Sequence, residues 1–130
     1  MSAAVDLAPS VAGAIAELEQ AGYTLSAVAL GDGGSLVTVH NFLFSDRWLP
    51  ESGDLTFEVP YNYPFAPIYP YYTTSELTRR EGERPAALQI VDWRGGRYTQ
   101  ISLRAPNWNP QIDTAAGAVA QVAHWFRCNG

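Results

Sequence analysis

The sequence predicts an α+β fold with an N-terminal helix, an antiparallel four-stranded meander, a proline-rich irregular segment and a C-terminal helix. Two observations predict it. Apolar residues recur with the helical period near both ends of the chain, and they alternate with polar residues between turn signals in the middle. A third observation concerns the domain organisation: the 130 residues contain neither an internal repeat nor a linker-like stretch. We therefore expect one domain over residues 1–130.

The first helix is expected over residues 10–21. Val11, Ile15 and Leu18 fall on one face of this helix, and Gly22 is a typical residue for the position just past a helix end. Strands are expected at 24–30 and 35–44, joined by a Gly-Asp-Gly-Gly hairpin turn. A third strand is expected at 54–60, where apolar and polar residues alternate.

Residues 61–74, with the proline just before them, carry four prolines and cannot form a regular central strand. We expect an extended segment here, with an edge strand near 68–73, followed by a mobile polar loop over 75–86. Residues 88–93 and 97–103 flank Arg-Gly-Gly-Arg and predict a second hairpin or extended pair. The last helix is expected over 113–127, capped by Asp113 or Thr114.

Composition excludes several function classes. A net charge of −5 is unfavourable for nucleic-acid binding. The N-terminal residues show neither a signal peptide nor a membrane-spanning run, and the single cysteine, Cys128, fits a reducing compartment, so a cytoplasmic location is expected. One cysteine and two separated histidines do not make a zinc site, and no motif indicates a cofactor.

The basic residues have an unusual composition. The chain has no lysine, and six of its arginines lie between Arg79 and Arg104. This basic stretch is interpreted either as a solvated surface or as a feature that orients a partner. The missing lysines reflect either the codon preference of the genome or a protein that avoids an amine nucleophile on its own surface.

Three short motifs resemble those of the ubiquitin-conjugating enzyme superfamily, in the family's order. They are Tyr63-Pro64-Phe65-Ala66-Pro67, then Ile101-Ser102-Leu103, then Trp108-Asn109-Pro110. The resemblance covers nearly the whole chain and is closest to the compact bacterial members. It implies the UBC-like fold and a place in a pathway that contains a ubiquitin-like protein and its activating enzyme.

The chain departs from the family pattern at the reaction centre. Ser102 stands where the family has its thioester-forming cysteine, and the family's His-Pro-Asn has no counterpart. A serine hydroxyl needs a base within hydrogen-bond reach, and the sequence places neither His40 nor His124 beside Ser102. Cys128 falls in the last three residues and is interpreted as a tail thiol after the final helix.

These observations favour a non-catalytic member of the family that binds or scaffolds an activating enzyme and a ubiquitin-like protein. Two alternatives stay open. The chain could be an active transferase carrying the ubiquitin-like protein on Ser102 as an oxyester, or an RWD-type interaction domain with no link to ubiquitin chemistry. The resemblance implies partner contacts near the first helix, the first hairpin and the serine segment, at Glu17, Glu19, Asp32, Arg104 and Trp108.

Overall fold

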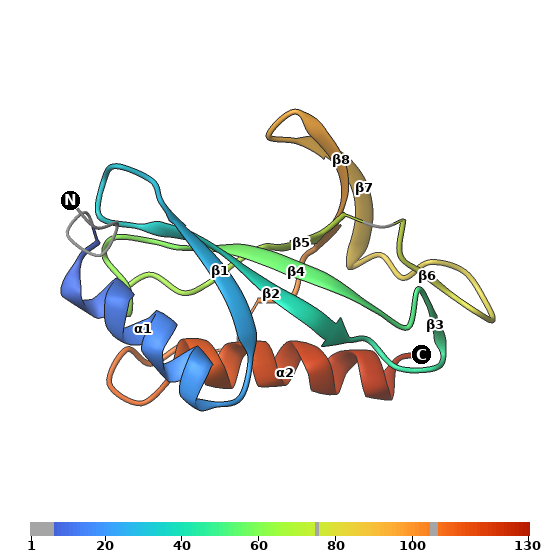
Figure 1. Cartoon of the computed structure of the whole chain (residues 1–130). Coiled ribbons are helices and arrows are strands. Elements are labelled where there is room, and N and C mark those ends of the chain that lie inside the picture. Colours follow the sequence, from blue (N-terminus) through green and yellow to red (C-terminus); the bar gives the residue numbers. More distant parts are fainter. Residues whose placement is uncertain (1–6, 75, 105–106) are drawn as a thin grey trace.

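The computed structural model describes residues 7–74, 76–104 and 107–130, and it has two helices on one face of an antiparallel sheet (Figure 1). The sheet has six strands in the order β1-β2-β4-β5-β8-β7. A separate two-stranded sheet pairs β3 with β6. The α+β class and the order of the helices and the first strands match the sequence prediction, whereas the sheet is wider than the four strands expected.

Helix α1 (Pro9–Gln20) begins and ends within one residue of the predicted bounds. Val11, Ala14 and Leu18 form its fully buried face. Gly22 adopts a φ of 98°, a conformation that favours glycine and turns the chain out of the helix. The helix therefore covers the start of the sheet with a narrow apolar stripe.

Strands β1 (Thr24–Ala29), β2 (Ser35–Leu43) and β4 (Ser52–Val59) form the predicted antiparallel meander. Their core-facing side chains, including Val37, Val39 and Phe57, are fully buried against the helices. A bulge interrupts the β2–β4 ladder between Val39 and Phe42, and Asn41 within it has a φ of 56°. Such a bulge bends the strand and changes the direction of the side chains beside it.

Strand β5 (Tyr71–Thr73) is not the edge strand that the prolines suggested. It pairs with β4 on one side and with β8 on the other, so it lies inside the sheet. All four prolines precede Tyr71, which leaves the amides of residues 71–73 free to join a ladder on both sides. The predicted second hairpin is present as β7 (Leu88–Trp93) and β8 (Gly96–Ile101), and its pairing with β5 widens the sheet to six strands.

The mobile loop predicted over 75–86 is wrong for its described residues. Strand β6 (Thr78–Arg79) pairs with β3 (Trp48–Leu49), and Leu77 beside it is fully buried. Arg79 Nε donates a hydrogen bond of 2.8 Å to the carbonyl oxygen of Asn129. The charged residues around Leu77 indicated an exposed loop, because a single leucine gives no periodic pattern from which a strand could be predicted.

Helix α2 (Ala115–Cys128) lies along the same face of the sheet as α1 (Figure 1). Of the two predicted caps it is Thr114 that acts, since its Oγ1 accepts a hydrogen bond of 3.0 Å from Gly117 N. Val119, Val122 and Phe126 of α2 lie in the core. Phe126 packs edge-on against Trp48 with ring centroids 4.9 Å apart, so the C-terminal helix and the small sheet share one core.

Candidate functional site

A cleft of about 640 Å3 lies between the segment that follows β8 and one side of α2. Its walls come from three elements: Tyr71 of β5, residues 102–104, and the α2 residues from Ala118 onward. The pairing of Tyr71 with Ile101 in the β5–β8 ladder places Tyr71 beside the segment that follows β8, and α2 forms the other wall of the cleft. The described part of the predicted reaction centre thus faces the C-terminal helix.

Ser102 forms two hydrogen bonds at the end of β8. Its amide donates to the carbonyl oxygen of Ala87 at 2.8 Å, and its Oγ accepts from Gln100 Nε2 at 3.1 Å. Among the described residues, no acidic or histidine side chain makes a hydrogen bond with Ser102 Oγ. A donor on the hydroxyl oxygen holds it in place but cannot remove its proton, so this arrangement does not activate a nucleophile.

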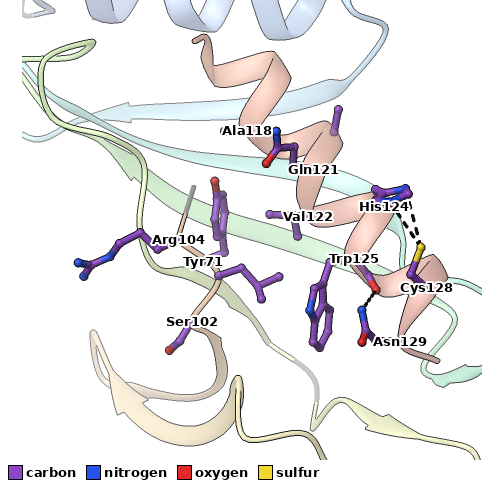
Figure 2. Close-up of a pocket in the computed structure, with 12 residues that line it drawn as sticks. Tyr71, Ser102, Arg104, Ala118, Gln121, Val122, His124, Trp125, Cys128 and Asn129 are labelled. Carbon is purple, nitrogen blue, oxygen red and sulfur yellow. Dashed lines mark hydrogen bonds between the residues drawn. The ribbon is translucent and has the colours of Figure 1, made fainter. Parts of the chain in front are cut away.

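Structure brings His124 into the cleft that Ser102 also lines, but not into contact with it. Figure 2 shows Ser102 across the cleft from His124, with Tyr71, Val122 and Trp125 between them. His124 lies exposed on α2. Proximity to one cleft therefore does not make His124 the base that Ser102 lacks.

Cys128 is not a tail thiol beyond the final helix, which corrects the prediction. It is the last residue of α2, and its Sγ lies 3.5 Å from His124 Nε2, one helical turn earlier (Figure 2). The helix holds the thiol on the cleft wall, with its side chain exposed. The sequence already carried this signal, because residues four apart on a helix are neighbours.

Tyr71 contributes a phenol to the cleft. Burial raises the pKa of Tyr71 far above the ordinary tyrosine value of 10.0. The phenol therefore keeps its proton at neutral pH and can donate a hydrogen bond, but it cannot act as a general base. Tyr71 lines the cleft together with Ser102, a relation that no local sequence pattern indicates.

The two flanking motifs are joined by side-chain hydrogen bonds. Trp108 Nε1 donates to the carbonyl oxygen of Pro64 at 2.6 Å, and its ring packs at 6.4 Å from that of Tyr63. Tyr63 Oη accepts a hydrogen bond of 2.8 Å from the amide of Ala115. Trp108 therefore packs against Tyr63 and Pro64 of the first motif. The hydrogen bond between Tyr63 and Ala115 connects these motifs to the start of α2.

The basic stretch does not form a single charged patch. Arg80 contacts Glu51 at 3.0 Å, Arg97 contacts Glu76 at 3.2 Å, and Arg104 lies over the ring of Tyr69 at 4.4 Å. These partners belong to different parts of the fold. The interpretation as ordinary surface residues therefore accounts for the described arginines better than a patch that orients one partner.

Nor do the predicted acidic contacts form one surface. Glu17 and Glu19 are two positions apart on α1 and so point to different sides of the helix. Asp32 accepts a hydrogen bond of 2.8 Å from Gly34 N, which stabilises the first hairpin turn. This turn lies against the opposite end of α1, where Ala8 N donates to the carbonyl oxygen of Gly33 at 2.9 Å.

No protein-family model, curated protein or solved structure matches the chain. In the described part of the chain, no group of three or more histidine, cysteine, aspartate and glutamate side chains is placed to hold a metal ion. Neither described helix has the length and apolar character needed to cross a bilayer.

Proposed function

We propose that this chain is a non-catalytic, UBC-like domain of a bacterial ubiquitin-like modification pathway. In this role it binds an activating enzyme and a ubiquitin-like protein without carrying either as a covalent adduct. The observation that carries the proposal is the contact between the two flanking motifs, because Trp108 and Pro64 meet directly while a serine occupies the position between them in the chain.

The contact supports the resemblance in a way that isolated short motifs cannot. Tyr63-Pro64 and Trp108 are more than forty residues apart, yet they share a hydrogen bond and ring packing at the start of α2. Motifs that matched by chance would have no reason to meet in space. The helix, meander and helix around them have the order that the resemblance implies.

The surroundings of Ser102 argue for binding rather than transfer. Its hydroxyl oxygen accepts a hydrogen bond from the neutral amide of Gln100, and the phenol of Tyr71 in the same cleft holds its own proton. Covalent transfer needs a base that removes the nucleophile's proton. The absence of lysine is compatible with a protein that works beside activated carboxyl groups without becoming their target.

The partner surface in this proposal lies on the solvent-facing side of α1, with the exposed Glu19 as its acidic contact. Asp32 contributes through the shape of the hairpin turn that it stabilises. Arg104 and Tyr69 offer an exposed cation–aromatic pair on the serine side, which suits a peptide segment.

The experiment is a reconstitution with an activating enzyme and a ubiquitin-like protein from the same genome, the partners that this proposal requires. Wild type, Ser102→Ala and Cys128→Ala are each incubated with both partners and ATP, and adducts are resolved on gels with and without thiol. The proposal predicts co-purification with at least one partner and no covalent adduct on any of the three proteins. Glu19→Arg is expected to weaken co-purification, whereas Glu83→Arg on the far loop is the matched control.

Other outcomes select the alternatives. A thiol-resistant, hydroxylamine-labile adduct that disappears only in Ser102→Ala means an oxyester-forming transferase. A thiol-sensitive adduct that disappears only in Cys128→Ala means that the thiol on α2 carries the partner. Failure to bind either partner overturns the proposal and leaves the RWD-type interaction domain.

A further inference from the structure

Three polar side chains form a hydrogen-bonded chain on the sheet face opposite the helices. Ser26 Oγ lies 2.7 Å from His40 Nε2, and His40 Nδ1 lies 3.3 Å from Asp54 Oδ1. The three residues belong to the neighbouring strands β1, β2 and β4. Both helices lie on the other side of this sheet (Figure 1), so the chain of side chains faces outward.

Register explains why these residues meet. Thr24 pairs with His40 and Ser26 with Thr38, which places Ser26 diagonally across from His40 on the same face. Val39 pairs with Leu55, so His40 and Asp54 come next to each other where the β2–β4 bulge begins. The left-handed conformation of Asn41 immediately after His40 belongs to that bulge. Bulges of this kind often direct a side chain beside a reactive site.

We propose that Ser26 is a nucleophile for acyl transfer, with His40 as its general base and Asp54 as the group that orients His40. The imidazole tautomer with its proton on Nδ1 donates to Asp54 and accepts from the Ser26 hydroxyl. This sequence of nucleophile, base and orienting carboxylate is the arrangement that activates serine in unrelated folds. The inference goes beyond the proposed function, in which the chain is non-catalytic at Ser102, because it uses neither the cleft nor Ser102.

The reaction balances without any further reactant except water. Ser26 Oγ forms a bond to the acyl carbon while its proton passes to His40 Nε2. The bond from that carbon to the leaving oxygen or sulfur then breaks, and the leaving group takes the proton from His40. Water repeats the sequence on the acyl-serine, releases a carboxylic acid and restores the hydroxyl.

The substrate class follows from the position of β1 at the edge of the sheet. Leu30 N donates to the carbonyl oxygen of Gly34, so the even-numbered residues of β1 face β2. In an antiparallel pair, successive residues alternately face the partner strand and the opposite side, so the N–H of Ala27 points outward from the free edge of β1. An outward amide next to the nucleophile is a donor for an oxyanion. The open face suits esters or thioesters with an accessible acyl carbonyl, such as one at the end of an extended chain.

The test uses diisopropyl fluorophosphate, which phosphorylates an activated serine with loss of fluoride. Intact mass and peptide mapping are measured on wild type, Ser26→Ala, His40→Gln and Asp54→Asn, and Ser52→Ala is the control for an exposed serine on the same sheet. We expect one adduct per wild-type chain, on Ser26. Labelling should fall by at least about tenfold in His40→Gln and Asp54→Asn and stay unchanged in Ser52→Ala.

A second measurement follows the release of p-nitrophenol from p-nitrophenyl acetate in a Cys128→Ala background, which removes the single thiol. Ser26 is exposed, so Ser26→Ala is expected to fold, and circular dichroism checks this. A purely structural hydrogen-bond chain would leave both readouts at background. The proposal is overturned if wild type takes up no adduct, if the adduct maps elsewhere, or if hydrolysis is equal in wild type and Ser26→Ala.

Discussion

Replacing Tyr63 with phenylalanine tests whether the tyrosine of the first motif acts through structure. The substitution keeps the aromatic ring, and with it the packing against Trp108, but it removes the oxygen that accepts a hydrogen bond from Ala115 N. Tyr63 is 5% exposed and Ala115 is fully buried. The amide of Ala115 belongs to the first turn of α2, where the helix itself provides no acceptor.

The expected cost follows from leaving one buried donor without a partner. Such a loss destabilises a protein by about 1–3 kcal/mol. The amide of Ala115 lies at the start of α2 rather than in its interior, so we expect a cost in the lower half of that range. For a domain of this size each kcal/mol lowers Tm by about 4 °C. We therefore expect Tyr63→Phe to lower the free energy of unfolding by about 1–2 kcal/mol and Tm by about 4–8 °C.

Thermal and urea unfolding, followed by far-UV circular dichroism, measure both quantities. The matched control is Tyr61→Phe, two residues earlier, where the side chain is 59% exposed and the change should stay within about 0.5 kcal/mol. Equal stability of the two variants would refute the reasoning, because the buried hydrogen bond would then contribute nothing to holding the motif on α2.

Two further predictions concern stability. Burial raises the pKa of Tyr71, so the folded state keeps a phenol proton that the unfolded chain loses above pH 10. The contribution of Tyr71 to the free energy of unfolding is therefore fully present below pH 10 and falls as the pH rises further. Tyr71→Phe should remove this pH dependence, which amounts to up to about 1.4 kcal/mol per pH unit. Urea unfolding between pH 9 and 11.5 measures it. If the free energy of unfolding changes with pH equally in wild type and variant, the assignment to Tyr71 is contradicted. Leu77→Ala should lower the free energy of unfolding by about 2–5 kcal/mol because the Leu77 side chain is fully buried. Leu43→Ala, at a side chain that is 64% exposed, should lower it by less than about 1 kcal/mol. Similar urea midpoints for the two variants would mean that Leu77 lies in a surface loop.

Local patterns predicted the elements whose signals are periodic. The stripe of Val11 and Leu18 indicated α1, and the alternation through Phe57 indicated β4, because one face of each element must be buried. The prediction was wrong where one residue type was taken to describe a whole segment. The prolines before Tyr71 led to the prediction of an edge strand where Tyr71–Thr73 lies inside the sheet. The arginines near Leu77 led to the prediction of a mobile loop around a residue that is fully buried.

The candidate site was predictable only in part. The motif order indicated Ser102, and the spacing of four between His124 and Cys128 could have shown their contact on one helix. The distance of Ser102 from His124 could not be obtained from sequence, because it depends on how α2 lies across the sheet. For the same reason the sequence could not show that Ser26 and Asp54 lie beside His40.

By itself the sequence determined the α+β class, the two helices, both hairpins and the serine at a position where the resembling family has a cysteine. Each of these depends on residues close together in the chain, where period, turn chemistry and motif order are readable. Only the tertiary structure decided which strand lies inside the sheet, which side chains share the cleft and which three residues meet on the open face. Those relations depend on strand register and helix placement, and packing of the whole chain sets both.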